Sequence, residues 1–168
     1  MHQILIPTKR AELLKGKELM ERARRRLGCE LEIKNENELV INGEAFNEYN
    51  ARVVMQAFAR GFEFDTACKL LSDDRFFESV DMKQIFKNED QIKRIKARVI
   101  GTEGKTKNYI QSVSGADLAI YGDTVSMIGT VDEIKIAKAA LEVLLEGGTH
   151  KKAYAIMEKA KHRLKEGR

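Results

Sequence analysis

Apolar positions along this 168-residue chain follow two periods, one typical of short strands and one typical of amphipathic helices. Pro7 closes the first strand, and Gly28 ends the second helix with a left-handed cap. The elements predicted for the first half are a strand over 2–6, helices over 11–27 that break near Gly16, strands over 29–33 and 39–41, and a helix from Glu44 or Asn47 to Gly61.

The second half shows the same kinds of pattern. Thr130 and Glu133 form an S/T-x-x-E capping box, which predicts the start of a helix. The predicted elements are a connecting helical segment over 62–81, a strand over 82–86, helices over 92–100 and 106–113, strands over 116–120 and 125–128, a helix over 130–146, and a last amphipathic helix from Thr149 to about Leu164.

The two halves align with each other, and each predicts the order β-α-α-β-β-α. The aligned pairs include Gly28 with Gly115, Leu39 with Val125, Met55 with Leu141, and Gly61 with Gly147. One difference stands out, because Gly101 and Gly104 align with Leu14 and Lys17 in the first half. We therefore expect a single ligand loop, in the second half.

The loop from Gly101 to Gly104 is a Gly-x-x-Gly turn between two predicted helices. Glycine adopts positive φ and has no Cβ to obstruct a ligand that lies close to the backbone. A helix that begins at Lys105 points unpaired N–H groups at the loop, and such a helix start favours phosphate. The loop therefore looks suited to hold a phosphodiester backbone.

Two other interpretations compete for this loop. Residues 104–106 resemble the end of a Walker A motif, but Val99 stands where that motif requires glycine, which argues against a nucleoside triphosphatase. A plain helix–helix turn is the other interpretation, and the pattern by itself does not exclude it.

Charge is unevenly distributed along the chain. Residues 9–26 carry eight basic and three acidic residues, and residues 93–107 carry six basic and one acidic. Residues 30–90 carry fourteen acidic and seven basic, whereas residues 145–168 carry seven basic and three acidic. The basic segments suggest a nucleic-acid face, and the acidic middle suggests a surface for a basic protein. A solvated charged surface is the alternative.

Other chemistry is sparse. Cys29 and Cys68 lack ligand spacing, and the three histidines stand apart from cysteines and carboxylates, so we expect reduced thiols, no metal and no cofactor. The sequence shows no membrane-spanning run and no evident signal peptide. Without a nucleophile–base pair or a nucleotide loop, we expect a non-catalytic, cytoplasmic protein.

With Gly-x-x-Gly between the first two helices of its second half, the chain resembles two tandem type I KH units. The expected fold is α+β, with two three-stranded antiparallel sheets packed on helices and an extra C-terminal helix. Residues 1–80 would form a degenerate first unit with the connecting helix, and residues 81–168 the second unit. The run from Arg98 to Lys107, with residues 114–117, 121–126 and 144–150, resembles the archaeal and eukaryotic KH ribosome-assembly family that partners the Nob-type endonuclease.

This resemblance implies binding of single-stranded RNA near the 3′ end of small-subunit rRNA during maturation. It also implies protein partners: the endonuclease, an rRNA dimethylase and, in archaea, the alpha subunit of initiation factor two. KH loops hold about four nucleotides by the backbone, above an apolar groove for the bases. The candidate RNA-binding residues are Arg98, Ile100, Gly101, Thr102, Glu103, Gly104, Lys105, Lys107, Asn108, Ile110 and Leu118.

Each apolar candidate for the groove, Val113 and Ile120 among them, is equally well explained as a core residue. A second hypothesis for the whole chain is a protein-interaction adaptor whose two KH units are scaffolds and whose RNA binding is incidental. It predicts weak RNA binding that is blind to sequence and disappears near physiological salt.

Overall fold

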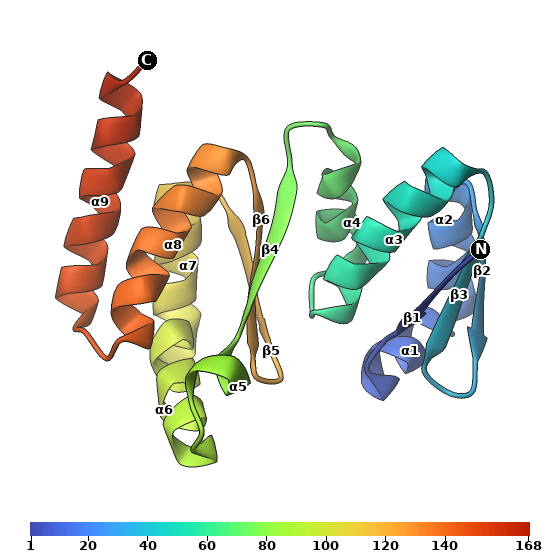
Figure 1. The fold of residues 1–168 in the computed structure, drawn as a ribbon, viewed down its shortest axis with the longest axis horizontal. Helices are drawn as coiled ribbons and strands as arrows, with labels where there is room; N and C mark the ends of the chain where they lie inside the picture. The colour runs from blue at the N-terminus through green and yellow to red at the C-terminus, as the bar shows by residue number, and fades with distance from the viewer. The chain divides into compact units, whose positions relative to one another are not determined.

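A computed structural model describes residues 1–168 and divides them into two compact units, Met1–Asp73 and Asp74–Arg168 (Figure 1). We call them unit 1 and unit 2 and describe each by itself. The boundary expected after residue 80 falls inside a strand that begins at Phe76, so unit 2 starts earlier in the chain than the sequence suggested.

Unit 1 contains a three-stranded antiparallel sheet in the order β1-β3-β2. Leu39 and Ile41 on the central strand are fully buried, and Gly28 ends α2 in the left-handed conformation with φ 63°. The elements are β1 (His2–Leu5), α1 (Thr8–Leu14), α2 (Lys17–Leu27), β2 (Glu30–Lys34), β3 (Glu38–Asn42), α3 (Ala45–Ala59), α4 (Phe64–Ala67) and the 3-10 helix η1 (Cys68–Leu71).

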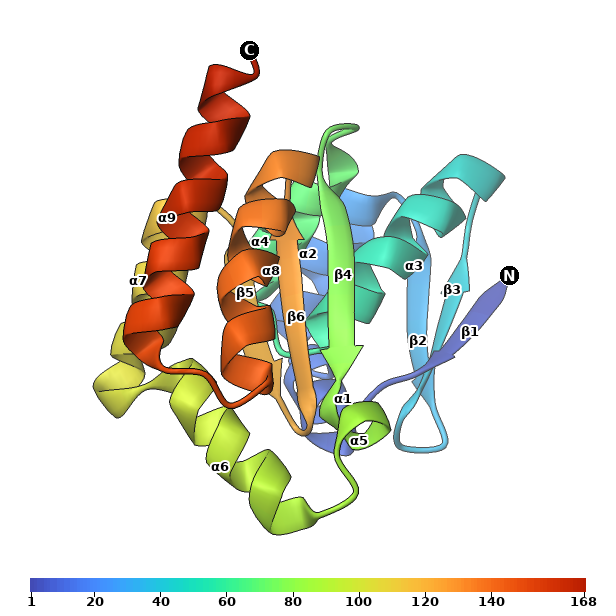
Figure 2. The same ribbon diagram turned by 60° about the vertical axis from the view of Figure 1, so that its left-hand side comes forward.

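Unit 2 repeats this plan and extends it at the C-terminus (Figure 2). Its antiparallel sheet has the order β4-β6-β5. The elements are β4 (Phe76–Asp81), α5 (Met82–Ile85), α6 (Glu89–Ile100), the 3-10 turn η2 (Thr102–Gly104), α7 (Lys105–Ser114), β5 (Asp117–Tyr121), β6 (Thr124–Gly129), α8 (Val131–Leu145) and α9 (His150–Glu166).

Two sequence predictions in this region are wrong. The end of the segment predicted as helical over 62–81 is strand β4, which pairs with β6 from Phe76↔Gly129 to Asp81↔Thr124. The strand predicted over 82–86 is the short helix α5, because the Asp81 carboxylate accepts a hydrogen bond from the Lys83 N–H (3.0 Å) and starts a helical turn. Residues 76–81, and not 82–86, form the strand because they pair with the edge of β6, and the local sequence pattern does not reveal that pairing.

The predicted capping box at the start of α8 is confirmed. The Thr130 hydroxyl accepts from the Glu133 N–H (3.3 Å), and the Glu133 carboxylate accepts from the Thr130 N–H (2.8 Å). The same carboxylate pairs with the Arg75 guanidinium at 2.8 Å. Glu133 therefore joins the start of α8 to the residues just before β4.

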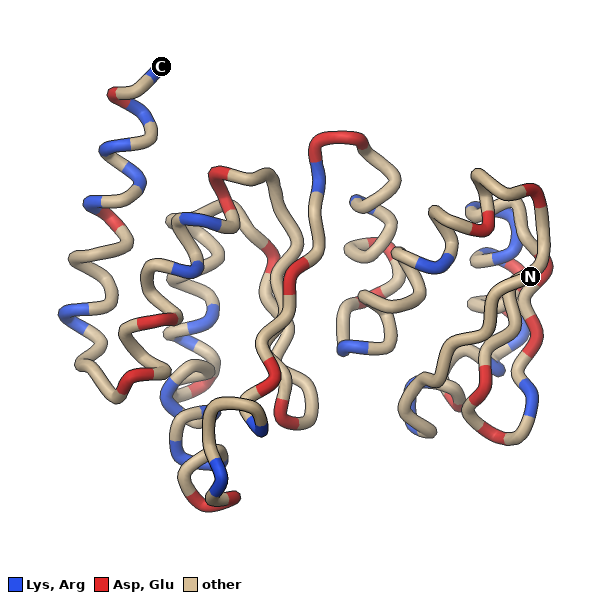
Figure 3. The backbone as a smooth tube through the Cα atoms, in the orientation of Figure 1, with Lys and Arg blue, Asp and Glu red and all other residues tan.

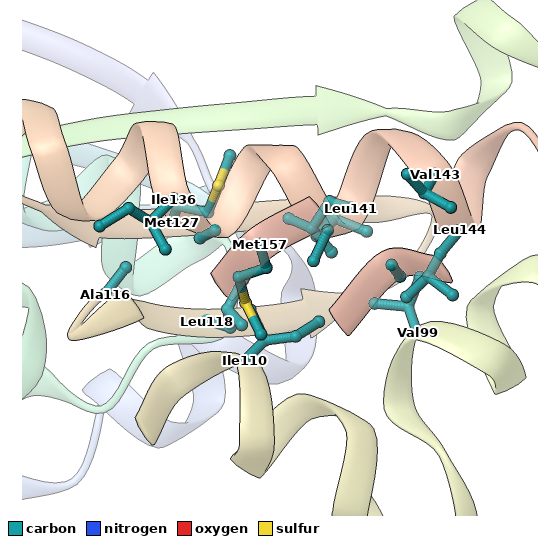
Figure 4. Packing of buried hydrophobic residues seen from close by; sticks show 14 of the residues in the cluster. Val99, Ile110, Ala116, Leu118, Met127, Ile136, Leu141, Val143, Leu144 and Met157 are labelled. Atoms are coloured by element: carbon teal, nitrogen blue, oxygen red, sulfur yellow. The ribbon is translucent and has the colours of Figure 1, made fainter. Parts of the chain in front are cut away.

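The core of unit 2 draws buried residues from α6, α7, strands β5 and β6, α8 and α9 (Figure 4). Ile110 is 0% exposed and Leu118 is 3% exposed. Ala153 and Met157 of α9 are also fully buried in this cluster. The C-terminal helix is therefore packed into the unit, and Ile110 and Leu118, expected as candidates for a base-binding groove, belong to its core.

Replacing Ile110 by alanine should lower the free energy of unfolding by about 2–5 kcal/mol, because the change leaves a cavity in a fully buried site. Val113→Ala on the same helix is the matched control and should cost about 1 kcal/mol or less, since Val113 is only half-buried. Urea unfolding followed by circular dichroism measures both. An Ile110→Ala variant as stable as the unchanged protein would contradict the core assignment.

Candidate nucleic-acid interface

The connection between α6 and α7 is a tight reversal in which three residues have positive φ. Gly101 has φ 75° and ψ 171°, Glu103 has φ 55°, and Gly104 has φ 75°. The Gly101 N–H donates to the Ala97 carbonyl (2.8 Å), which ends α6, and the Gly104 N–H donates to the Gly101 carbonyl (3.2 Å). Glycine adopts these angles without strain, and the turn forms where the sequence predicted it.

The two glycines are needed for different reasons. A Cβ atom on Gly101 would lie 2.3 Å from the Thr106 hydroxyl oxygen and 2.7 Å from the Thr106 nitrogen, so the start of α7 packs directly on Gly101. A Cβ on Gly104 would meet nothing closer than the Asn108 side-chain nitrogen at 3.8 Å. Gly101 therefore allows the turn to close, whereas Gly104 leaves open space in which a ligand can approach the backbone.

The start of α7 is suited to an anion. Gly104 is its N-cap, and no side chain accepts a hydrogen bond from the first N–H groups of the helix. Lys105 is exposed and Lys107 is half-buried, and neither lysine forms an ion pair. Thr102, Glu103 and Asn108 are also exposed. The Gly104 and Lys105 N–H groups bond to the Gly101 and Thr102 carbonyls, so the rest of the uncapped first turn and the two lysines together favour a phosphate at this helix start.

Arg98, expected to attract phosphate, is already engaged within unit 2. Its guanidinium donates to the carbonyl oxygens of Gly147 (3.3 Å) and Gly148 (2.5 Å), just beyond the end of α8. His150 contacts it from the other direction, since the ring Nε2 lies 2.9 Å from the Arg98 carbonyl oxygen. A carbonyl oxygen only accepts, so Nε2 is the donor.

The apolar candidates separate into two groups. Ile110 and Leu118 lie in the core, as described above, and offer no surface to a base. Ile100, Val113 and Ile120 are half-buried and keep part of their side chains exposed. Any apolar floor for bases is therefore formed from this second group.

Sequence reasoning missed a pair of tyrosines that connects α7 with α9. The rings of Tyr109 and Tyr154 lie 4.4 Å apart between centroids. The Tyr154 hydroxyl donates to the Thr106 hydroxyl (3.3 Å), and the Tyr109 hydroxyl donates to the Glu158 carboxylate. This bond to a carboxylate raises the pKa of Tyr109. No local pattern signals these contacts, which join residues far apart in the sequence.

Unit 1 has no comparable loop. Its first two helices are joined by Lys15 and Gly16, and Gly16 has φ −56°. The joint therefore lacks the succession of positive φ angles that opens the loop of unit 2.

Other kinds of site find little support. Cys29 is buried and Cys68 half-buried, both thiols are free, and burial raises the pKa of each. No group of three or more His, Cys, Asp or Glu side chains converges as metal ligands would. None of the helices combines the length and apolar character needed to cross a membrane.

Comparison with known proteins covers both the second unit and the whole chain. Residues 76–162 match a family model described as a eukaryotic type KH-domain (KH-domain type I). A KH domain-containing protein of Methanocaldococcus jannaschii is 35% identical over 97% of this chain and 75% of its own length. The pre-rRNA-processing protein pno1 of Schizosaccharomyces pombe is 33% identical over 67% of this chain, which spans 47% of that protein.

Solved structures agree in fold. Dim2p from Pyrococcus horikoshii superposes with a TM-score of 0.85 at 30% identity, covering 94% of this chain and 98% of that one. A chain in a crystal structure of an a/eIF2alpha–aDim2p–rRNA complex from the same organism gives a TM-score of 0.87 at 29% identity, covering 96% and 94%. With a family model over half its length and a close relative over nearly all of it, this chain belongs to the PNO1/Dim2 family of KH-domain proteins.

Proposed function

We propose that this protein is a non-catalytic factor that binds single-stranded RNA during maturation of the small ribosomal subunit. One observation carries the proposal: the Gly101–Gly104 loop presents an open backbone at the uncapped start of α7. Relatives named as pre-rRNA-processing proteins, and a similar chain in a complex with rRNA, support the choice of RNA as ligand.

The mechanism is binding through the RNA backbone. Phosphate oxygens accept hydrogen bonds from N–H groups of the loop and of the first turn of α7, apart from those of Gly104 and Lys105, which bond to the Gly101 and Thr102 carbonyls. Lys105 and Lys107 add charge beside them, and both are free of carboxylate partners. Glu103, exposed in the same loop, opposes the phosphate, so the lysines and the N–H groups supply the attraction. The bases then lie over Ile100 and its half-buried neighbours.

The RNA segment we propose is the 3′ region of small-subunit rRNA, with both units acting as tandem type I KH domains. Unit 1 serves as scaffold or protein contact, because its helix joint lacks the phosphate loop. The proposed protein partners are the 3′-end endonuclease, the rRNA dimethylase and the alpha subunit of initiation factor two. The rRNA complex of the P. horikoshii relative, which contains a/eIF2alpha, supports the last of these. The cytoplasmic location stays a prediction.

Gly104→Asp should weaken binding of a fluorescent RNA that copies the 3′ end of small-subunit rRNA by about 10- to 100-fold. The carboxylate would replace a phosphate at the N–H groups, and charged hydrogen bonds contribute about 1.5–3 kcal/mol each. The fold should persist at a cost of about 1–2 kcal/mol, because the space beside Gly104 is open but its φ of 75° strains any side chain. Fluorescence anisotropy at near-physiological salt measures the affinity.

Gly104→Asn is the matched control for this substitution. It has nearly the same size and tolerates the left-handed conformation, but it adds no charge, so it should bind more tightly than the aspartate variant. A scrambled RNA and a DNA copy test sequence and sugar preference. The RNA site would be rejected, and the protein adaptor favoured, if the protein bound the rRNA copy, the scrambled RNA and the DNA equally weakly and Gly104→Asp did not change this binding.

Lys105→Gln should reduce the salt dependence of RNA binding. Each phosphate neutralised on a single strand contributes about 0.7 to the slope of log affinity against log salt concentration, and loss of one contact should remove about that amount. Lys93→Gln is the matched control, since Lys93 is exposed on α6 about two turns before the loop. Titrations at several salt concentrations give the slopes, and identical slopes for the two variants would argue against a phosphate at Lys105.

A further inference from the structure

The end of α6 and the turn after α8 are joined by side-chain hydrogen bonds beside the Gly101–Gly104 loop. Helix α6 ends at Ile100 and α8 ends at Leu145, and the last carbonyl groups of any α-helix lack partners within it. The Arg98 side chain donates to the Gly147 and Gly148 carbonyls in the turn between α8 and α9, and the His150 side chain donates to the Arg98 carbonyl. We call this reciprocal pair the Arg98–His150 clamp.

Unit 1 contains half of the same arrangement. Arg10 of α1 donates to the Phe58 carbonyl (2.8 Å) and the Phe62 carbonyl (2.5 Å) at the end of α3. Phe62 occupies the place in unit 1 that Gly148 occupies in unit 2 when the two halves are aligned on their glycines. Arg10 aligns with Ala97, the residue before Arg98, so the two arginines are neighbours in the alignment and not equivalents. Arg10 nevertheless shows that an arginine can join α1 to the end of α3 in a unit without a Gly-x-x-Gly loop.

Unit 2 adds contacts that unit 1 lacks. Phe64 stands in unit 1 where His150 stands in unit 2, so the return bond to the arginine carbonyl is specific to the unit with the loop. One turn later, Tyr154 bonds to Thr106, whose backbone and hydroxyl pack against Gly101. The residues before and after the loop are thus both held by α9 or by the turn that leads into it.

We infer that Arg98 and His150 are positioning residues for the phosphate loop, which makes the start of the C-terminal helix part of the RNA-binding unit. This inference rests on the proposed function of the loop. The clamp fixes the end of α6, and the Tyr154–Thr106 bond fixes the start of α7. The loop N–H groups are then held in place before RNA arrives, which avoids the ordering cost of a mobile loop.

The inference separates a positional role from a direct contact. If Arg98 touched phosphate, removing its charge would lower the salt slope. If Arg98 acts through the clamp, its loss weakens binding while the number of neutralised phosphates, and hence the slope, stays the same. Figure 3 shows that basic residues recur along α6 and α9, so charge alone does not distinguish the two roles.

The test compares Arg98→Lys with His150→Phe in RNA titrations at several salt concentrations. Lysine keeps the charge of Arg98 but cannot bond to both carbonyls in the arginine geometry. Phenylalanine keeps a ring at position 150, where the His150 centroid lies 6.1 Å from that of Tyr154, but cannot donate to the Arg98 carbonyl. Each variant should bind about fivefold to tenfold more weakly with an unchanged slope. Hydrogen exchange of amides 101–106 in the free protein should be faster in both.

Lys105→Gln and Gly104→Asp run beside these variants. If they weaken binding while Arg98→Lys and His150→Phe bind as the unchanged protein does, the positioning role is wrong and the loop assignment stands. A third variant, Arg98→Gln, removes the charge. If it lowers the salt slope of RNA binding while Arg98→Lys binds normally, Arg98 is a phosphate contact and the positioning role is wrong. If Gly104→Asp binds normally, the loop assignment fails and this inference fails with it. Urea unfolding checks that each variant is folded. If Arg98→Lys does not fold, His150→Phe alone tests the positioning role.

Discussion

The contact between Gly101 and Thr106 is the constraint on which the proposed site depends. No side chain fits between the end of α6 and the start of α7, so the chain reverses within one turn of positive φ angles. That reversal leaves Gly104 as an N-cap with no side-chain oxygen. The Gly104 and Lys105 N–H groups bond to the Gly101 and Thr102 carbonyls, whereas no side chain caps the rest of the first turn of α7, and that open turn is the basis of the proposed phosphate site.

Much of the fold could be predicted because its signals are local. The left-handed cap at Gly28 and the Thr130 capping box act within one helical turn, and both occur where the sequence placed them. Strand β4 was missed because its position depends on pairing with β6, nearly fifty residues later in the chain. The run after it alternates like a strand, but the Asp81 cap makes it a helix. Local patterns cannot rank two neighbouring candidates for one sheet edge.

The predictions for the site also succeed where the signal is local and fail where it depends on distant residues. The Gly-x-x-Gly turn and the exposed Lys105 follow from adjacent residues, and both occur as expected. The sequence left Ile110 and Leu118 open between a groove floor and the core, and the structure buries both in a cluster that includes Met157 of α9. Arg98 is engaged by carbonyls 49 and 50 residues away. For these residues the surroundings of the side chain depend on α9 or on the turn before it. The sequence pattern around the loop does not reveal such distant contacts.

The unequal helices α4 and α9 start at equivalent places in the two units, yet α4 has 4 residues and α9 has 17. This difference has a consequence for synthesis. A nascent chain that ends at Leu145 already contains every residue of the loop but neither His150 nor Tyr154. The loop gains its contacts with His150 and Tyr154 once the α9 residues have left the ribosome's exit tunnel. Under the positioning role inferred for Arg98 and His150, the loop therefore emerges during translation before the contacts that order it can form.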